Sequence, residues 1–303
     1  MSLEADYIVE RRRLKRRLLF WRILALVIIG VAAITTLTNI EDIARSDHIA
    51  RLNVSGIIVD DFEREQTLFE LKSDDGVRAL IVRIDSPGGT VVGGESLYQQ
   101  LKAIGENKPV VAIMGSTATS AGYMTALGAD YLIAREGSLT GSIGVLLQTA
   151  DVTGLLDKIG IKPETIKSGA LKAQPNPMEP LSPEARAATK EVVMDMYAMF
   201  VDMVAERRKI PLEKVKVLAD GRVYSGRQAL ANGLIDAIGS EADAVDWLVE
   251  SRKIQPGLPV QDVKIERQGQ EWRQFFNGLV GKTLFSERVR LDGLVSLWHP
   301  EGW

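Results

Sequence analysis

Short apolar runs alternate with stretches of helical spacing through the first half of the chain. The apolar runs are rich in Val, Ile and Leu and end at turn-forming residues, which predicts strands at 48–60, 78–85, 109–114 and 130–134. Between them, apolar residues recur at intervals of three and four, which predicts helices at 62–73, 93–105 and 120–127. This alternation of strands and helices indicates an α/β fold.

The second half is predicted to be mainly helical. Ser182 is a favourable N-cap and Pro183 a favourable first helical residue, so a long helix is expected from there to about Arg208. Pro175, Pro177 and Pro180 predict an irregular connection before it. Further helices are expected at 210–220, 225–232 and 272–280, and a strand at 260–265.

The N-terminal segment pairs positive charge with an apolar run. Seven Arg and Lys residues fall between Arg11 and Arg22, and no charged residue occurs from Ile23 to Leu37. A bilayer span needs about 20 apolar residues, and positively charged flanks stay in the cytoplasm. We therefore expect an uncleaved transmembrane helix, with the N-terminus cytoplasmic and the rest of the chain on the other side. The alternatives are a cleaved signal peptide, with Val31-Ala32-Ala33 as a weak cleavage site, and a buried helix.

Composition removes several classes of function. The chain of 303 residues has no cysteine, which excludes disulfides, thiolate metal sites and cysteine nucleophiles. Its net charge of −3 gives no global attraction to nucleic acid. Metal-ligand spacings, phosphate loops and dinucleotide fingerprints are also missing from the sequence, so no cofactor or metal is expected. We divide the chain into a tail and anchor at 1–45, a catalytic domain at 46–253, and a C-terminal tail at 254–303 for docking or oligomer contact.

Ser120 is the candidate nucleophile because it lies where a predicted strand turns into a helix. The helix N-terminus supplies amide donors, and the small neighbours Ala121 and Gly122 allow close approach of a substrate backbone. The alternative is an ordinary helix cap, and four nearby hydroxyl groups compete for the role. These competitors are Ser116, Thr117, Thr119 and Thr125.

A serine nucleophile needs a base, and histidine is poorly placed for that role. The two histidines are His48, next to the N-terminal apolar run, and His299, near the C-terminus. Lys172 is the preferred base, with Lys162 and Lys167 as rivals. A lysine accepts a proton only when neutral, so burial has to lower the ordinary lysine pKa of about 10.4.

Ser86-Pro87-Gly88-Gly89 follows a predicted strand, and two glycines permit an exposed loop with its N–H groups aimed into a cleft. Such a loop could complete an oxyanion hole, although an ordinary turn explains it equally well.

Five segments in this order resemble the short form of the bacterial signal peptide peptidases, the SppA-type serine proteases. They begin at Asp85, Thr119, Thr140, Lys167 and Ala219, reading DSPGG, TSAGY, TGSIGV, KSGALK and ADGRVYSG. The resemblance covers about Ile49 to Leu248. The tail beyond it matches no pattern of that family.

The resemblance implies a ClpP/crotonase-like fold of repeated strand-strand-helix units and a Ser/Lys dyad. Ser120 would be the nucleophile, Lys172 the general base, and Ser142 the residue that orients the lysine. The amide of Gly89, with that of Ser120 or its neighbour, would form the oxyanion hole.

The family assembles into rings in which the dyad can form between subunits. Its substrates are extended apolar peptides, the signal peptides left in the bacterial inner membrane, and its catalytic domain is extracytoplasmic (periplasmic). Three alternatives fit the sequence less well. They are a related Ser/Lys protease that cuts an integral membrane or stomatin-like protein, a crotonase-like acyl-CoA enzyme, and a non-catalytic membrane scaffold.

Overall fold

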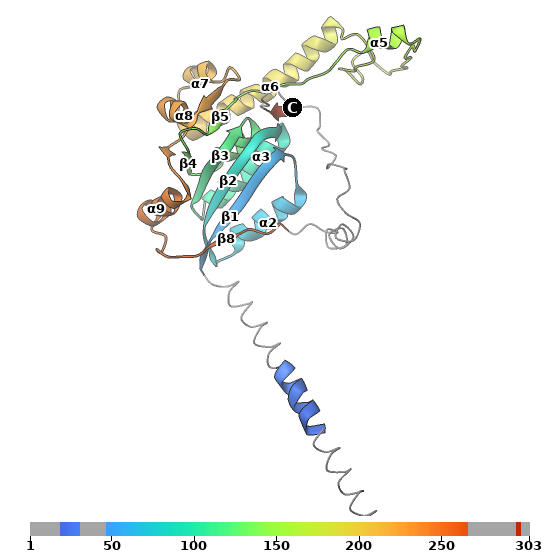
Figure 1. Cartoon of the computed structure of the whole chain (residues 1–303). Coiled ribbons are helices and arrows are strands. Elements are labelled where there is room, and N and C mark those ends of the chain that lie inside the picture. Colours follow the sequence, from blue (N-terminus) through green and yellow to red (C-terminus); the bar gives the residue numbers. More distant parts are fainter. Residues whose placement is uncertain (1–18, 31–46, 266–294, 298–303) are drawn as a thin grey trace, which may run out of the picture. The chain divides into compact units, whose positions relative to one another are not determined.

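The structure is a computed structural model that describes residues 19–30, 47–265 and 295–297 (Figure 1). The chain divides into two units, residues 1–47 and residues 48–303. In the first unit, residues 19–30 are helical and most of their apolar side chains are exposed. Among the described residues, the helices do not combine the length and hydropathy needed to cross a bilayer. The rest of the predicted span, from Val31 onward, lies outside the described residues.

The second unit is built on one sheet, which has nine strands within the described residues. The main strand order is β6-β5-β3-β2-β1-β8, with β4 beside β3, β7 beside β4, and β9 beside β2. Pairing is parallel except for β5 with β6 and β2 with β9. The strands are β1 (His48–Ile58), β2 (Val77–Thr90), β3 (Val110–Thr119), β4 (Tyr131–Ala134), β5 (Leu139–Gly141), β6 (Val223–Ser225), β7 (Ala237–Ile238), β8 (Val260–Asp262) and β9 (Val295–Leu297).

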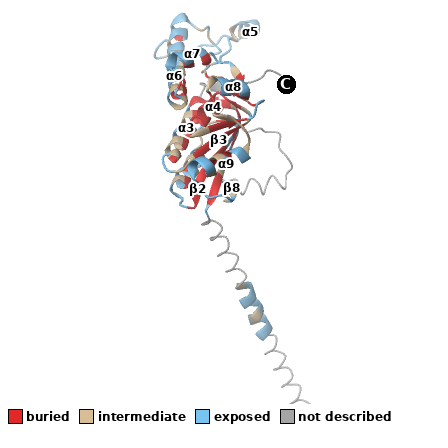
Figure 2. Cartoon of the chain, turned by 90° about the vertical axis from the view of Figure 1, so that its left-hand side faces the viewer, coloured by how far each residue is buried: buried red, intermediate tan, exposed pale blue. Residues whose placement is uncertain are grey.

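Helices cover both faces of this sheet, as Figure 2 shows by the buried strands between them. The helices of this unit are α2 (Phe62–Ser73), α3 (Val91–Gly105), α4 (Ala121–Ala126), α5 (Thr153–Lys158), α6 (Pro183–Arg208), α7 (Leu212–Leu218), α8 (Gly226–Asn232) and α9 (Glu241–Arg252). Helices α2, α3, α4 and the end of α6 pack on one face, while α9 packs on the other. The mixed α/β architecture predicted from the sequence is therefore confirmed.

The strand sequences explain why both faces are covered. In β2, Leu80, Val82 and Ile84 belong to the core under α3 and α4. The alternate residues Ala79 and Ile81 belong to the core under α9. Side chains of a strand point alternately to opposite faces, so a strand covered on both sides reads as a continuous apolar run.

The sheet extends further than predicted at one end. Ser86 to Gly89 is not an exposed loop: strand β2 continues through it to Thr90, and Ser86, Gly88 and Gly89 are buried. The register with β3 shifts between Ile84 and Ser86, which bends the strand at this point. Strand β3 also runs past Met114 to Thr119, and there it leaves β4 and pairs with β5. The bends bring the ends of β2, β3 and β5 together.

A long connection, which we call the arm, joins β5 to α6 and comprises residues 146–182. Its only helix is the short α5, and none of its residues is buried. Both views show it projecting beyond the sheet at the N-terminal end of α6 (Figures 1 and 2). Ser182 caps α6 as predicted, by accepting a hydrogen bond from the Ala185 amide at 3.1 Å. The helix predicted at 272–280 lies outside the described residues.

Candidate active site

Ser120 occupies a strained turn between β3 and α4. Its backbone has φ 58° and ψ −120°, a conformation that residues with a side chain rarely adopt. A sharp strand-to-helix turn of this kind presents a serine hydroxyl at the end of a sheet in known hydrolases. The side chain of Ser120 makes no capping bond to its own helix, so the role of an ordinary N-cap does not explain it.

The four competing hydroxyl groups are placed differently. Thr119 donates to the Pro87 carbonyl at 3.0 Å, and Thr125 donates to the Ala121 carbonyl at 2.9 Å. Ser116 and Thr117 lie within strand β3. Ser120 is therefore the one hydroxyl of the five at the start of α4.

The segment Gly141-Ser142 lies directly across from Ser120. The Ser120 amide donates to the Gly141 carbonyl at 2.8 Å, and the Ser142 amide donates to the Arg222 carbonyl at 2.8 Å. Gly141 and Ser142 also have positive φ, at 81° and 51°. Because the Ser120 amide is bound, an oxyanion hole at this turn has to use the next amide, that of Ala121. Ser142 is buried beside the turn, as a residue that orients a base would need to be.

Gly89 lies at the end of β2, beside the same turn. Ser86 pairs with Ala118 across β2 and β3, so the segment from Ser86 to Gly89 is next to the residues that precede Ser120. An ideal Cβ on Gly122 would meet the Ser86 carbonyl oxygen at 3.1 Å. The missing side chain at Gly122, two residues after Ser120, thus lets α4 approach the β2 segment closely. The structure brings Ser120, Ser142 and the Gly89 segment together.

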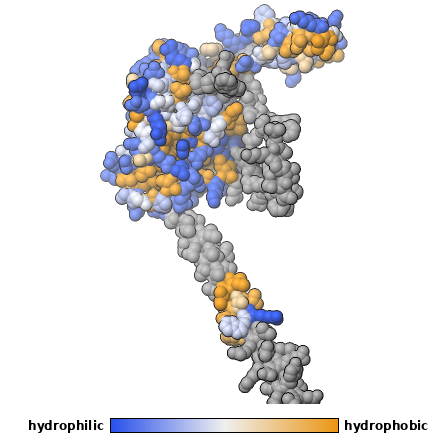
Figure 3. All heavy atoms as spheres, in the orientation of Figure 1, coloured by the Kyte–Doolittle hydropathy of each residue, from blue (hydrophilic) through white to orange (hydrophobic). Residues whose placement is uncertain are grey.

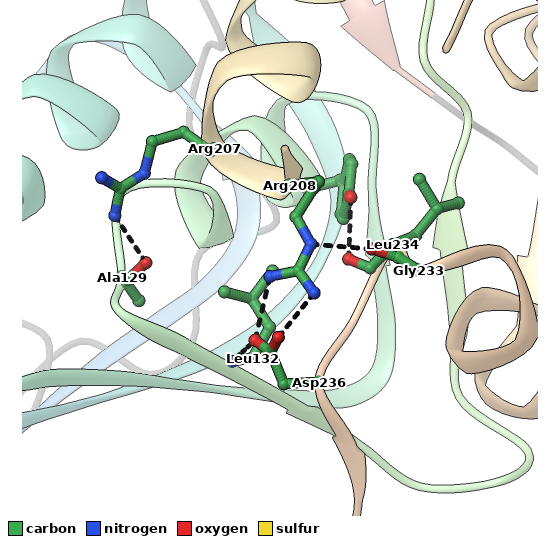
Figure 4. A network of polar contacts seen from close by, with 8 residues as sticks. Ala129, Leu132, Arg207, Arg208, Gly233, Leu234 and Asp236 are labelled. Carbon is green, nitrogen blue, oxygen red and sulfur yellow. Dashed lines mark hydrogen bonds and ion pairs between the residues drawn. The ribbon is translucent and has the colours of Figure 1, made fainter. Parts of the chain in front are cut away.

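Two arginines at the end of α6 belong to a polar network beside α4, the helix that follows Ser120 (Figure 4). Arg207 donates to the carbonyls of Leu127 and Ala129, both at 2.8 Å, just after α4 ends. Arg208 binds both carboxylate oxygens of Asp236, at 2.7 and 2.9 Å.

Tyr123, on α4, completes this support. It is fully buried and donates to the Leu234 carbonyl at 2.8 Å. Burial raises the pKa of its phenol, and although burial alone would lower the pKa of Arg208, the Asp236 hydrogen bond raises it. The phenol therefore stays neutral and the guanidinium charged. The sequence analysis did not anticipate this network.

Lys172 lies elsewhere, on the arm. Its side chain is exposed, and its amide donates to the Gly169 carbonyl at 3.1 Å in a turn. The arm extends away from the sheet in both views (Figures 1 and 2), and Lys172 is exposed on it whereas Ser120 is buried.

The rival lysines differ in their surroundings. Lys167 donates to Glu179 at 2.5 Å and is only 13% exposed, so its side chain is held in an ion pair with that carboxylate. Lys162 is exposed on the arm.

The histidines remain poor bases in the structure. His48 begins β1, at the end of the parallel sheet opposite to the one where β3 leads into Ser120. The 11 residues of β1 span roughly 33 Å at the usual rise of a strand. His299 lies outside the described residues.

Strand β9 is an unpredicted neighbour of the site. Residues Val295–Leu297 pair antiparallel with the end of β2, with Ser296 opposite Gly89 and Leu297 opposite Gly88. A strand of three residues is too short to show a clear period, so the sequence offered little to find it.

The described residues contain no cluster of three or more His, Asp or Glu side chains that could hold a metal ion.

Comparison with known proteins gives consistent matches. The family model described as peptidase family S49 matches residues 102–255. A Synechocystis protein provisionally named a protease is 40% identical over 210 residues, which cover 69% of this chain and 76% of that protein. An Enterococcus faecium protein provisionally named signal peptide peptidase SppA is 36% identical over 230 residues, which cover 71% of this chain and 67% of that protein.

Among solved structures, a mutant of ClpP1 from Listeria monocytogenes matches with a TM-score of 0.44 and 18% identity, over 64% of this chain and 92% of that chain. The assignment to a family is based on the sequence matches and not on this structural match. The chain belongs to peptidase family S49 and is a serine endopeptidase.

Proposed function

We propose that this endopeptidase is anchored in the bacterial inner membrane, degrades remnant signal peptides, and uses a dyad of Ser120 from one copy and Lys172 from a neighbouring copy. The observation that carries the proposal is the contrast between the two residues. Ser120 is held at a strained, buried turn, whereas the base expected from the sequence is exposed on the arm. A second copy is the simplest source of a lysine for the turn.

The surface of the arm supports contact with another copy. Seven of its large apolar side chains are exposed, and apolar colour gathers on the arm in Figure 3. Exposed apolar patches of this kind mark interaction sites, and homo-oligomers are the commonest assemblies. The residues are Leu146, Leu155, Ile159, Ile161, Ile166, Leu171 and Met178. Docking of the arm would also desolvate Lys172, which a lysine base requires.

The substrate is expected to bind as an extended strand. The edge of β2 at Gly88–Thr90 accepts an antiparallel strand, since β9 of the same chain pairs there. Main-chain hydrogen bonds at a sheet edge bind peptides with little regard to side chains, which suits mixed apolar signal peptides. A substrate in this position would replace β9 and pass beside Ser120.

In the proposed reaction, the Ser120 Oγ attacks the scissile carbonyl carbon while Lys172 takes the proton of the Ser120 hydroxyl. The amides of Gly89 and Ala121 stabilise the oxyanion, and Ser142 orients the lysine. The lysine then gives its proton to the leaving amine, which leaves an acyl-enzyme on Ser120. Water, deprotonated by Lys172, attacks the ester carbonyl and releases the second peptide.

The proposal of a membrane anchor is based on residues 19–30. In the part of the chain that is described, this helix has a nearly complete apolar surface exposed, including Phe20, Trp21 and Ile28. A helix apolar on all sides is typical of a lipid environment. The basic residues before it favour a cytoplasmic N-terminus, and so an extracytoplasmic catalytic domain.

The test uses the full-length protein in mild detergent with a labelled synthetic signal peptide. We expect Ser120→Ala and Lys172→Ala to lose cleavage by about a thousand-fold or more, while Lys162→Ala keeps it. The native rate should rise with pH as the base loses its proton. Full activity in Lys172→Ala would disprove the dyad. A native protein that ignores signal peptides but reacts with a phosphonate at Ser120 would favour a protease for a specific membrane protein.

A further inference from the structure

The carboxylate of Glu179 closes the loop of the arm that carries Lys172. It accepts hydrogen bonds from Lys167 at 2.5 Å, from Gln174 at 2.8 Å and from Asn176 at 3.1 Å. Lys167 precedes Lys172 by five residues and Gln174 follows it by two. One side chain therefore holds both ends of the segment that presents the proposed base.

This loop has no apolar core to define its shape. None of the residues of the arm is buried, so packing contributes little to its order. Fixing the backbone of each residue costs conformational entropy, which polar bonds have to offset here. Charge-assisted hydrogen bonds are the stronger kind, and the bond from Lys167 lowers the pKa of Glu179.

The local backbone shows that the loop is a defined turn. The Lys172 amide donates to the Gly169 carbonyl at 3.1 Å, and the Gln174 amide donates to the Leu171 carbonyl at 3.3 Å. Ala173, between Lys172 and Gln174, has φ 59°. A residue with a side chain keeps such a conformation only where its surroundings hold it. The bond from Gln174 to Glu179 is the contact next to that residue.

We propose that Glu179 is a positioning residue for Lys172: by binding both ends of the loop, it fixes the direction in which the lysine is offered to Ser120 of the neighbouring copy. This inference rests on the proposed dyad. It also favours Lys172 over Lys167 as the base, since the same carboxylate holds the Lys167 side chain in an ion pair. Glu179 touches neither substrate nor nucleophile, so its effect is transmitted through the loop.

The test compares Glu179→Gln with Glu191→Gln in the full-length enzyme, using the labelled signal peptide. Glu191 is exposed on α6, so its variant makes the same chemical change away from the loop. A misplacement of about 1 Å can lower a rate by roughly a hundred-fold. We expect Glu179→Gln to reduce kcat by about ten- to a hundred-fold with KM changed less than about two-fold, because the peptide edge is untouched. Glu191→Gln should match the native enzyme.

Two further measurements separate positioning from a general structural effect. The Tm and the oligomer size of Glu179→Gln should equal those of the native protein, because no core residue is involved. The hydrogen bonds that the Glu179 carboxylate accepts from Lys167, Gln174 and Asn176 are called the clamp below. A double variant of Glu179→Gln with Lys167→Gln should lose no more activity than Glu179→Gln alone, since both changes break this clamp. Native kcat in Glu179→Gln, loss of the oligomer, or additive losses in the double variant would each overturn the proposal.

The same series distinguishes failure of the clamp from failure of the dyad. If Lys172→Ala is inactive and Glu179→Gln is fully active, the dyad stands and the positioning role is wrong. If Lys172→Ala is active, the dyad is wrong and the positioning role falls with it.

The clamp also predicts a dependence on pH. The charged side chains that line the hollows around Glu179 are Asp151, Glu164, Lys167 and Arg186. Because the pKa of Glu179 is lowered in the folded protein, its contribution is fully present above the ordinary glutamate pKa of about 4.3 and is lost as pH falls below it. The protection factors of residues 167–174, which correct for the intrinsic dependence of exchange on pH, should therefore fall in acid in the native protein. In Glu179→Gln they should be low at every pH, and equal protection factors in both proteins would contradict the clamp.

Discussion

Positive backbone φ angles at Ser120, Gly141 and Ser142 concentrate strain on both sides of one hydrogen bond. Such conformations cost roughly 1–3 kcal/mol each for residues with a side chain, and they persist only where the surrounding structure holds them. Here the surroundings are the ends of β3 and β5 and the ring of Tyr224. The geometry at Ser120 is thus maintained by its neighbours rather than by local preference.

Gly141 tests this dependence at the level of one residue. A Cβ at this position would lie 2.6 Å from the ring of Tyr224, whose hydroxyl is fixed by the Leu218 carbonyl at 2.8 Å. We expect Gly141→Ala to lower the free energy of unfolding by about 2–4 kcal/mol, from positive φ and the clash together. Gly137→Ala is the matched control, since nothing lies within 4 Å of its Cβ. Equal melting temperatures for the two variants would show that the turn is not constrained as described.

Residue-level reasoning from the sequence located residues whose place in the fold follows from their immediate neighbours. Ser120 could be selected because a strand end, a helix start and two small residues are adjacent in the chain. Glu179 could not be selected from the sequence, because the role proposed for it depends on a loop closure that joins Lys167, Gln174 and Asn176. Nothing in the spacing of these residues predicts that one carboxylate meets all three donors.

At the scale of elements, the short α4 depends on the longer α6. Helix α4 has six residues, too few to be stable alone, and all six are buried. The Arg207 guanidinium binds the carbonyls of Leu127 and Ala129 beyond its C-terminal end, where a positive charge also suits the helix dipole. Helix α6 in turn connects to the arm. The proposed nucleophile and the proposed base are therefore attached to opposite ends of one helix.

Replacing Arg207 by glutamine should loosen this attachment. The change removes charged donors from two carbonyls, which costs roughly 2 kcal/mol and lowers the Tm by roughly 4–8 °C. Hydrogen exchange at α4 should accelerate, and the reaction of Ser120 with a small phosphonate should slow. Arg252→Gln is the control, because Arg252 is 44% exposed and lies over Trp247 on the other face of the sheet. Native exchange at α4 in Arg207→Gln would refute the attachment.

The elements themselves were predicted unevenly. Helices α2 and α6 begin and end within a residue or so of the predicted positions, because strong caps or clear periodicity define them. The continuation of β2 through Ser86-Pro87-Gly88-Gly89 was missed, because local turn preferences dominate that sequence while the pairing partners lie far away in the chain. Strand β5 was missed for the same reason.

At the scale of the whole molecule, the separation of Ser120 from Lys172 predicts that active sites are shared. The Ser120→Ala variant retains Lys172, and the Lys172→Ala variant retains Ser120. Co-expression of Ser120→Ala with Lys172→Ala, each with a different tag, should therefore give mixed oligomers in which about a quarter of the sites receive both residues. Activity should reappear at about a quarter of the native level, although each variant alone is inactive.

Only oligomers carrying both tags should be active, so tandem affinity purification followed by the signal peptide assay measures the effect. A third variant carrying both substitutions provides the control. Mixing the double variant with native protein lowers the fraction of complete active sites, but it cannot form a complete active site from two inactive chains. If the mixed oligomers form but remain inactive, the two residues must come from the same chain. The arm would then have to fold back onto its own sheet, by a rearrangement of the connection between β5 and α6.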